Sequence, residues 1–217
     1  MFQLRLDRPS QASCKVLCLG AHSDDIEIGC GGTMLRLLKM YPNAEVWWVV
    51  FSAAGSRRRE AQNSADAFLR GASKSKVVLK GFRESYLPFL GEEVKDFFES
   101  IKRRFSPDVV FTHYRHDLHQ DHRVISEFTW NTFRNHLVLE YEIPKYDGDL
   151  GIPNTFVPLD SWTCQTKVKN LLAHFHTQRE KHWFSEDLFL SLLRLRGMEC
   201  NAASRYAEAF YSRKLVL

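Results

Sequence analysis

The sequence predicts an α/β fold, a Rossmann-like, doubly wound and mostly parallel sheet with helices on both faces. Over about the first 140 residues, short apolar runs typical of buried strands alternate with segments that carry apolar residues at helical spacing. The chain has 217 residues, of which 44% are hydrophobic and 26% charged, and this balance is typical of a globular protein with a real core. We therefore expect a single domain over residues 1–217.

The strands and helices can be placed in order from these two patterns. Lys15–Gly20 is a short apolar run that ends in glycine, as buried strands often do. A helix is expected over Thr33–Met40, because its apolar positions have helical spacing and Pro42 follows. Glu45–Phe51 contains the longest apolar run and is the second strand. The same patterns predict a helix at 57–69, a strand at 76–79, a helix at 92–105, a strand at 108–112, a helix at 121–133 and a strand at 136–141.

The pattern changes after Pro144. Residues 146–158 are rich in Gly, Pro, Asp and Asn, so a loop that covers part of the molecule is expected there. Helices are predicted at about 162–178 and 185–195, and the tail, 207–217, has the pattern of a strand.

Hydropathy and cysteine usage exclude several classes of protein. No apolar run approaches the roughly 18 residues of a membrane helix, so no integral membrane segment is expected. Met1–Ser13 lacks the apolar centre of a signal peptide, and we expect a cytoplasmic protein. The five cysteines are scattered and form no CxxC pair, which argues against a disulfide framework and against a thiolate zinc site.

The net charge of +4 is unevenly distributed along the chain. Between Arg57 and Arg83 there are eight basic residues and two acidic ones. Two interpretations stay open, a solvated surface and a local field for an anionic ligand such as a phosphorylated sugar. Nucleic acid is not expected as a partner, because no interleaved aromatic residues or known nucleic-acid motif accompany the charge.

Two polar clusters directly follow the first and fourth predicted strands. They are residues 21–25, with the sequence AHSDD, and residues 113–122, with the sequence HYRHDLHQDH. Ligands of open α/β sheets bind beyond the carboxyl ends of the strands, so both clusters are expected at one rim of the sheet. Imidazole and carboxylate without thiolate suit zinc in a catalytic site or ferrous iron.

Other polar residues of the second cluster have open roles. For His113 and His116, a hydrogen-bonded structural role and direct participation both remain possible. Asp117 is expected to cap its loop or to anchor a histidine from outside the ligand shell.

A glycine-rich run, 29–32, follows the first cluster. Its spacing is not G-x-G-x-x-G, and Asp24 and Asp25 lie where a pyrophosphate needs neutral backbone groups. Close packing of the helix start against the sheet is therefore expected in place of nucleotide binding.

These motifs resemble a known family. Residues 21–33, AHSDDIEIGCGGT, are similar to the signature of the LmbE/PIG-L de-N-acetylase family, and residues 119–122, HQDH, resemble its second motif, H-x-D-H. The run Arg57-x-x-Glu60-Ala61 is similar to a further R-x-x-E-A element. The chain departs from the family pattern at Ser23, where proline is usual, and at Glu84, where an aspartate that contacts the sugar is expected.

The resemblance implies a zinc-dependent hydrolase that removes acetyl from an N-acetylated amino sugar, such as an N-acetylglucosamine glycoside, a sugar nucleotide or a related glycan. Fe²⁺ or another divalent metal is an alternative to Zn²⁺. Carried over to this chain, the resemblance makes His22, Asp25 and His122 the metal ligands. It makes Asp24 the general base, His119 the acid or oxyanion stabiliser, and Asp121 the residue that orients the His119 ring.

The chemistry of the residues is compatible with these roles. Asp24 and Asp25 are adjacent and cannot normally point the same way, so one can bind metal while the other faces a water molecule. His119 and His122 are one helical turn apart. Arg57 begins a predicted helix at the same rim and is expected to hold a phosphate or a sugar hydroxyl.

Two alternative functions stay open at this point. One is a non-catalytic α/β protein that binds a ligand, and the other is a metal hydrolase of another amide or of an ester. For the deacetylase and for the alternative metal hydrolase, the expected partner is a small molecule.

Overall fold

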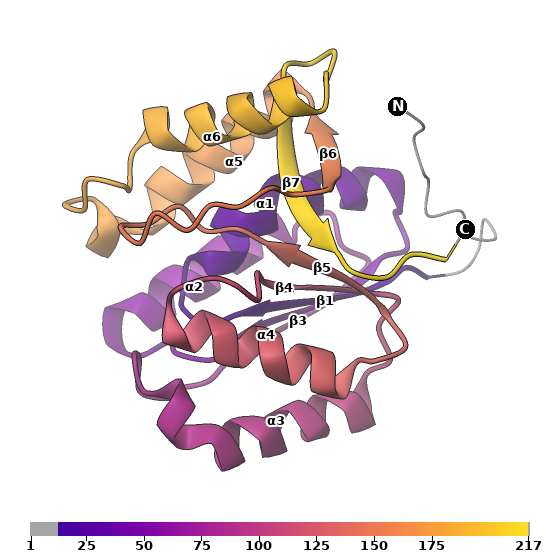
Figure 1. Ribbon diagram of the computed structural model, residues 1–217, viewed down its shortest axis with the longest axis vertical. Helices are drawn as coiled ribbons and strands as arrows, with labels where there is room; N and C mark the ends of the chain where they lie inside the picture. The colour runs from indigo at the N-terminus through magenta and orange to yellow at the C-terminus, as the bar shows by residue number, and fades with distance from the viewer. Residues whose placement is uncertain (1–12, 217) are drawn as a thin grey trace.

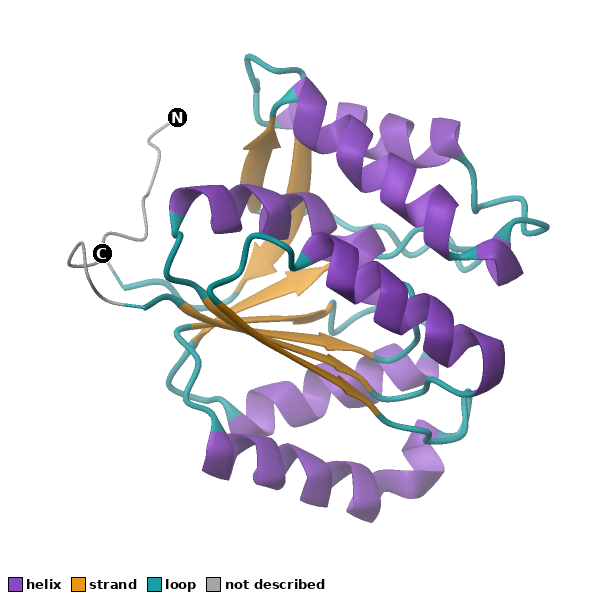
Figure 2. Ribbon diagram, turned by 180° about the vertical axis from the view of Figure 1, so that it is seen from behind, coloured by secondary structure: helices purple, strands orange, loops and turns teal. Residues whose placement is uncertain are grey.

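The structure is a computed structural model that describes residues 13–216, and its centre is one seven-stranded sheet with helices on both faces (Figures 1 and 2). The strand order is β3-β2-β1-β4-β5-β7-β6. The first five strands pair in parallel, while β7 runs antiparallel to both of its neighbours. The predicted fold class is confirmed. The strands are β1 Lys15–Gly20, β2 Glu45–Val50, β3 Lys74–Leu79, β4 Val109–His113, β5 Leu137–Tyr141, β6 Thr155–Leu159 and β7 Tyr206–Ser212.

Each face of the sheet is covered by its own group of helices. Helices α3 (Gly91–Arg104) and α4 (Gln120–Thr132) cover one face, below the sheet in Figure 1. The opposite face carries α1 (Asp25–Met40), α2 (Gly55–Phe68), α5 (Ser161–His174) and α6 (Glu186–Glu199). Two short 3₁₀ turns, Leu87–Leu90 and His176–Gln178, complete the structure. Within residues 13–216, no helix combines the length and the apolar character needed to cross a membrane.

The two tryptophans of β2 show how one strand serves both faces. Successive side chains of a strand point to opposite sides of the sheet. Trp48 therefore packs near Phe68 of α2, with ring centroids 6.1 Å apart, while Trp47 stacks on Phe105 at 4.8 Å, next to α3. This is why the run at 46–51 is apolar at every position, as expected for a strand buried on both sides.

Helix α1 begins at Asp25, and the predicted start at Thr33 is wrong. The glycines of the run 29–32 lie inside the helix, and Gly29 and Gly31 leave room for neighbouring side chains. A Cβ atom on Gly29 would lie 2.2 Å from Cδ2 of Tyr141, and one on Gly31 would lie 2.7 Å from Cε1 of Phe68. The expectation that this run serves close packing is confirmed.

The chain after Pro144 also differs from the sequence prediction. Residues 155–158, expected as the end of a loop, belong to strand β6, which pairs with β7 at the edge of the sheet. Proline is tolerated in an edge strand, so Pro158 does not break it. The helix predicted over 162–178 divides into α5 and a 3₁₀ turn, and α6 continues to Glu199. The predicted tail strand ends at Ser212; Leu217 and most of the Met1–Ser13 segment lie outside the described residues.

Substituting Gly29 by alanine should destabilise the fold. The added methyl group overlaps the Tyr141 ring, and overpacking of this kind costs about 1–3 kcal/mol of unfolding free energy. Gly71→Ala is the matched control, because its Cβ atom would meet Leu38 Cβ at an ordinary 3.5 Å. Urea unfolding followed by circular dichroism measures both variants. Equal stability of the two variants would contradict the packing role of Gly29.

Candidate active site

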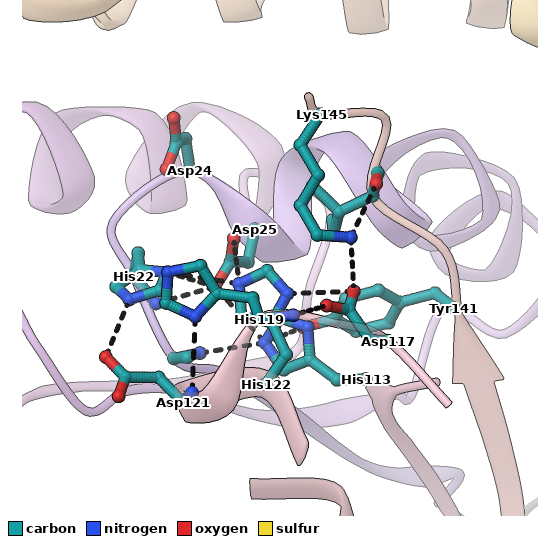
Figure 3. Close-up of polar contacts among 12 residues, drawn as sticks. His22, Asp24, Asp25, His113, Asp117, His119, Asp121, His122, Tyr141 and Lys145 are labelled. Carbon is teal, nitrogen blue, oxygen red and sulfur yellow. Dashed lines mark hydrogen bonds and ion pairs between the residues drawn. The ribbon is translucent and has the colours of Figure 1, made fainter. Parts of the chain in front are cut away.

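The candidate site lies at the carboxyl ends of β1 and β4, which are neighbours in the sheet. His22, Asp24 and Asp25 follow β1, and Asp25 is the first residue of α1. Because β1 and β4 are parallel, the loop after β4 and the first turn of α4 reach the same rim. Figure 3 shows His119 and His122 beside His22 and Asp25. The two polar clusters that the sequence predicts at one rim are therefore side by side.

Three of these side chains bring ligand-type atoms close together. Nδ1 of His22 lies 3.1 Å from Nε2 of His122 and 3.5 Å from Oδ2 of Asp25. Nε2 of His122 lies 3.6 Å from Oδ1 of Asp25. Donor atoms bound at 2.0–2.1 Å around a tetrahedral zinc ion are themselves about 3.3 Å apart. The His22–His122 spacing therefore fits a metal ion of that size, whereas the two contacts of Asp25 involve different carboxylate oxygens. The three-residue groups whose ligand-type atoms all lie within 4.8 Å of one another are His22, His119 and His122, and Asp25, His113 and His122.

The outer nitrogen of each histidine is held by a buried carboxylate. Nε2 of His22 lies 3.1 Å from Oδ2 of Asp121, and Nδ1 of His122 lies 2.9 Å from Oδ2 of Asp117. A carboxylate accepts hydrogen bonds, so it favours the tautomer that carries the proton on that outer nitrogen. On this tautomer the inner Nε2 of a neutral His122 ring turns its lone pair toward His22 and Asp25. These groups need a positive charge beside Asp25, which a protonated His22 ring or a bound cation supplies.

The electrostatics of the two histidines agree with this requirement. Burial alone lowers the pKa of His22, but the nearby Asp25 charge and the Asp121 hydrogen bond raise that pKa to about 10. Burial and the neighbouring His113 lower the pKa of His122 to about 3, so its ring is neutral and available as a ligand. The site thus favours a positive charge beside His22 and Asp25, while the neutral His122 ring keeps a lone pair.

The place of Asp121 differs from the sequence prediction. The resemblance set its carboxylate against the His119 ring, but the structure places it on His22. Its two oxygens also accept the backbone N–H groups of Ser85 at 2.6 Å and Leu87 at 3.1 Å. Its backbone N–H donates to Nδ1 of His119 at 3.2 Å. Asp121 therefore positions both rings, one with its side chain and one with its main chain.

His119 is presented as a hydrogen-bond donor. Because its Nδ1 accepts the Asp121 N–H, the proton of the neutral ring is on Nε2. Burial, and next the charge of His22, lower the pKa of His119, which favours the neutral ring. The ring is half-buried and stacks on His122 with centroids 4.6 Å apart. Its nitrogen also lies close enough to His22 and His122 to form a second ligand-type group with them.

Asp24 points away from the other members of the site and pairs with an arginine. Its Oδ1 accepts Nη2 of Arg57 at 2.9 Å, whereas its buried Oδ2 has no hydrogen-bond partner among the described residues. Burial raises the pKa of Asp24, and Arg57 opposes the rise. Nη1 of Arg57 reaches Glu84, which is half-exposed, at 3.4 Å. The structure thus joins Asp24 to both predicted substrate-binding residues.

Several residues around the site had open roles or carried no signal in the sequence. Asp117 anchors His122, one of its two expected roles. His113 is fully buried; its Nε2 accepts the Ala21 N–H at 2.9 Å and lies 3.1 Å from Oδ2 of Asp25. It forms a ligand-type group with Asp25 and His122. His116 is exposed and packs edge-on against Tyr114. Lys145, whose ammonium group lies 3.0 Å from Asp117, carried no signal in the sequence because it belongs to no motif.

Solved structures of similar fold include deacetylases and an enzyme of another class. The N,N'-diacetylchitobiose deacetylase from Pyrococcus horikoshii is 22% identical, with a TM-score of 0.70 over 91% of this chain and 83% of that chain. The zinc-inhibited form of the teicoplanin deacetylase Orf2 is 16% identical, with a TM-score of 0.72 over 91% of this chain and 97% of that chain. GalB, the 4-carboxy-2-hydroxymuconate hydratase from Pseudomonas putida, is 16% identical, with a TM-score of 0.66 over 94% and 98%. These likenesses establish the fold.

The family itself is established by sequence. Comparison with functionally curated sequences gives no match. The family profile described as PIG-L, GlcNAc-PI de-N-acetylase, matches residues 17–133, which is more than half of the chain and includes both polar clusters. The chain therefore belongs to the PIG-L family of de-N-acetylases.

Proposed function

We propose that the protein is a metal-dependent hydrolase that removes the acetyl group from an N-acetylated amino sugar. The observation that carries this proposal is the buried, unpartnered Oδ2 of Asp24, one residue from a cluster of atoms spaced for a metal ion. Amide hydrolysis needs a base for the attacking water and a donor for the oxygen that becomes negative. Asp24 and His119 are the two groups suited to these tasks.

The metal is held by His22, Asp25 and His122 in this proposal. When bound there, a zinc or ferrous ion supplies positive charge that makes water more acidic and polarises the acetyl oxygen. The chain's contribution is to fix the ligands before the ion binds. Asp121 and Asp117 hold the outer nitrogens of the two histidines, and the His22 backbone N–H donates to Oδ2 of Asp25 at 2.6 Å.

The proton transfers are assigned to residues that do not hold the metal. Oδ2 of Asp24 accepts a proton from the attacking water, while Arg57 on Oδ1 keeps the carboxylate oriented. The Nε2–H of His119 donates to the oxyanion that forms when the acetyl carbon becomes tetrahedral. When the C–N bond breaks, the proton that Asp24 took from the water passes to the amine nitrogen, and the acetyl group leaves as acetate.

The substrate is placed at the rim formed by Arg57 and Glu84. Arg57 is mostly buried and Glu84 is half-exposed, so the pair borders the site on its open side. The positive charge of residues 57–83 favours an anionic group on the sugar, such as a phosphate or a nucleotide. The proposed partner is therefore a small acetamido sugar, free or linked to a phosphate-bearing group.

Incubating the zinc-loaded protein with a panel of acetamido sugars should give a product lighter by about 42 Da, together with acetate. Mass spectrometry identifies the product, and the panel includes acetate esters and other amides to cover hydrolysis of another bond. Asp24→Asn should retain its metal and lose about 10²–10⁴ in kcat, because it lacks the base. A protein that binds these sugars and releases acetate from none of them would be a binding protein, contrary to the proposal.

One divalent metal per chain should remain after dialysis of the wild-type protein. Alanine at His22, Asp25 or His122 removes a ligand atom and should abolish stoichiometric metal, as measured by plasma mass spectrometry. His116→Ala is the matched control, since this histidine is exposed on the loop between β4 and α4 and should leave the metal in place. Full metal retention in His122→Ala would remove that residue from the ligand set, and metal loss in Asp24→Asn would exchange the roles of Asp24 and Asp25.

Arg57→Ala should lower kcat as well as raise KM. The sequence predicts only a substrate contact, whose loss raises KM, but the bond to Asp24 adds an effect on the base itself. Arg59→Ala is the control, because this arginine is exposed and lies in the same positively charged first turns of α2. An Arg57→Ala enzyme with unchanged kcat and raised KM would limit Arg57 to substrate binding. Unchanged values of both constants would remove it from the site.

A further inference from the structure

We propose that Lys145 is a positioning residue of the metal centre. Its ammonium group fixes the carboxylate of Asp117, and Asp117 in turn fixes the ring of His122. The inference rests on the proposed function, because His122 is a metal ligand only if that proposal holds. It assigns a role to a residue that lies outside both sequence motifs, on the loop between β5 and β6.

Lys145 reaches into the site from this loop. Figure 3 shows its side chain extended toward Asp117, and the side chain is only 10% exposed. Nζ lies 3.0 Å from Oδ2 of Asp117 and also forms an ion pair with Oδ2 of Asp149. A lysine that is so little exposed gives up most of its hydration, and such lysines are retained where they have a partner.

Asp117 links this lysine to two histidines of the site. It is buried, and its Oδ2 binds both Lys145 and Nδ1 of His122. Its Oδ1 accepts the backbone N–H of His119 at 2.8 Å. The position of one carboxylate therefore sets the orientation of the His122 ring and the path of the chain at His119.

Asp149 gives Lys145 a second task. Oδ2 of Asp149 accepts the backbone N–H of Leu118 at 2.7 Å, so this carboxylate also lies against the segment that carries His119. Asp149 and Asp117 are both buried and both contact the same Nζ atom. Lys145 is thus the shared cation of two carboxylates that would otherwise repel each other.

Removal of the ammonium group has a defined consequence. Two buried carboxylates remain near each other without their common cation, and Asp117 loses the contact that holds it against His122. The His122 ring is then less well oriented for a metal ion. Residues that orient metal ligands in this way typically account for 10–100-fold in metal affinity or activity.

The test compares the zinc affinity of the full-length protein and its variants by competition with a chromophoric chelator at fixed pH. Lys145→Met should raise the zinc Kd by about tenfold or more. Lys95→Met is the matched control, because Lys95 also bridges a carboxylate and a second helix, through Glu99 and Thr132, away from the site. Its zinc Kd should equal that of the wild type.

A double variant separates the charge argument from general damage. In Lys145→Met/Asp149→Asn, the second carboxylate charge is gone, while the asparagine oxygen can still accept the Leu118 N–H. If the two carboxylates repel each other, this double variant should bind zinc more tightly than Lys145→Met alone. A residue with a merely structural role would give the opposite order, because a second substitution in the same loop adds further damage.

A spectroscopic signature reports on the hydrogen bond directly. The Nδ1–H of His122 should give a slowly exchanging downfield imidazole signal in the NMR spectrum of the zinc-loaded wild type, and this signal should be lost in Asp117→Ala. In Lys145→Met the signal should shift or broaden. Lys145→Gln removes the charge with less change in polarity, and it replaces Lys145→Met if that variant does not fold.

The outcomes distinguish this inference from the proposed function. A Lys145→Met protein whose zinc Kd is within twofold of the wild type overturns the role of Lys145 and leaves the metal centre intact. A wild-type protein that binds no zinc or ferrous ion overturns the metal centre and this inference with it. A raised Kd in Lys145→Met, partly restored in the double variant, supports the inference.

Discussion

The geometry of the candidate site depends on two buried carboxylates that each hold one histidine by its outer nitrogen. Asp117 and Asp121 are 2% and 0% exposed, and a buried charge is stable only when its hydrogen bonds are made. Asp121 meets this need with His22 and with two backbone N–H groups from the segment after β3. Asp117 meets it with His122, the His119 backbone and Lys145. These hydrogen bonds connect the loops that follow β1, β3, β4 and β5. They also fix the rings of His22 and His122, and with them the ring nitrogens that face the centre of the site.

The other half of the site depends on how closely α1 approaches the sheet. Asp25 begins this helix, so its position follows that of the whole helix. Within the helix, Glu208 of β7 accepts the backbone N–H groups of Gly32 at 2.7 Å and Thr33 at 2.5 Å. Lys167 of α5 pairs with Glu208 and donates to the carbonyl oxygen of Ile28 at 2.6 Å. A Cβ atom on Gly32 would lie 2.9 Å from the Glu208 carboxylate, so glycine is what permits this contact. Lys167 and Glu208, late in the chain, thus help to place Asp25, a metal ligand in the proposed function.

These long-range contacts explain which features the sequence could predict. The first and fourth strands and the two polar clusters depend on local patterns, and they were predicted at the correct rim. The glycines of α1 contact Tyr141 and Glu208, which lie far away in the chain, so the apolar spacing alone places the helix start too late, at Thr33. The carboxylate of Asp121 is two residues from His119 in the sequence, yet it binds a ring that arrives from another strand. Lys145 lies in a segment with no periodicity, so only the folded chain shows its contact with Asp117.

The fold leaves the reaction open, since a hydratase and several deacetylases have structures similar to this one. The chemistry is decided by how the adjacent carboxyl groups Asp24 and Asp25 differ. Asp25 is the first residue of α1 and turns toward three histidines. Asp24 precedes the helix without a side-chain capping hydrogen bond and turns toward Arg57. An arginine on both oxygens of Asp24 would neutralise it as a base. Arg57 contacts Oδ1 of Asp24 alone, and its other amino group is directed to Glu84. Glu84 therefore competes with Asp24 for the arginine, and this competition leaves Oδ2 of Asp24 free for the role of base that we propose.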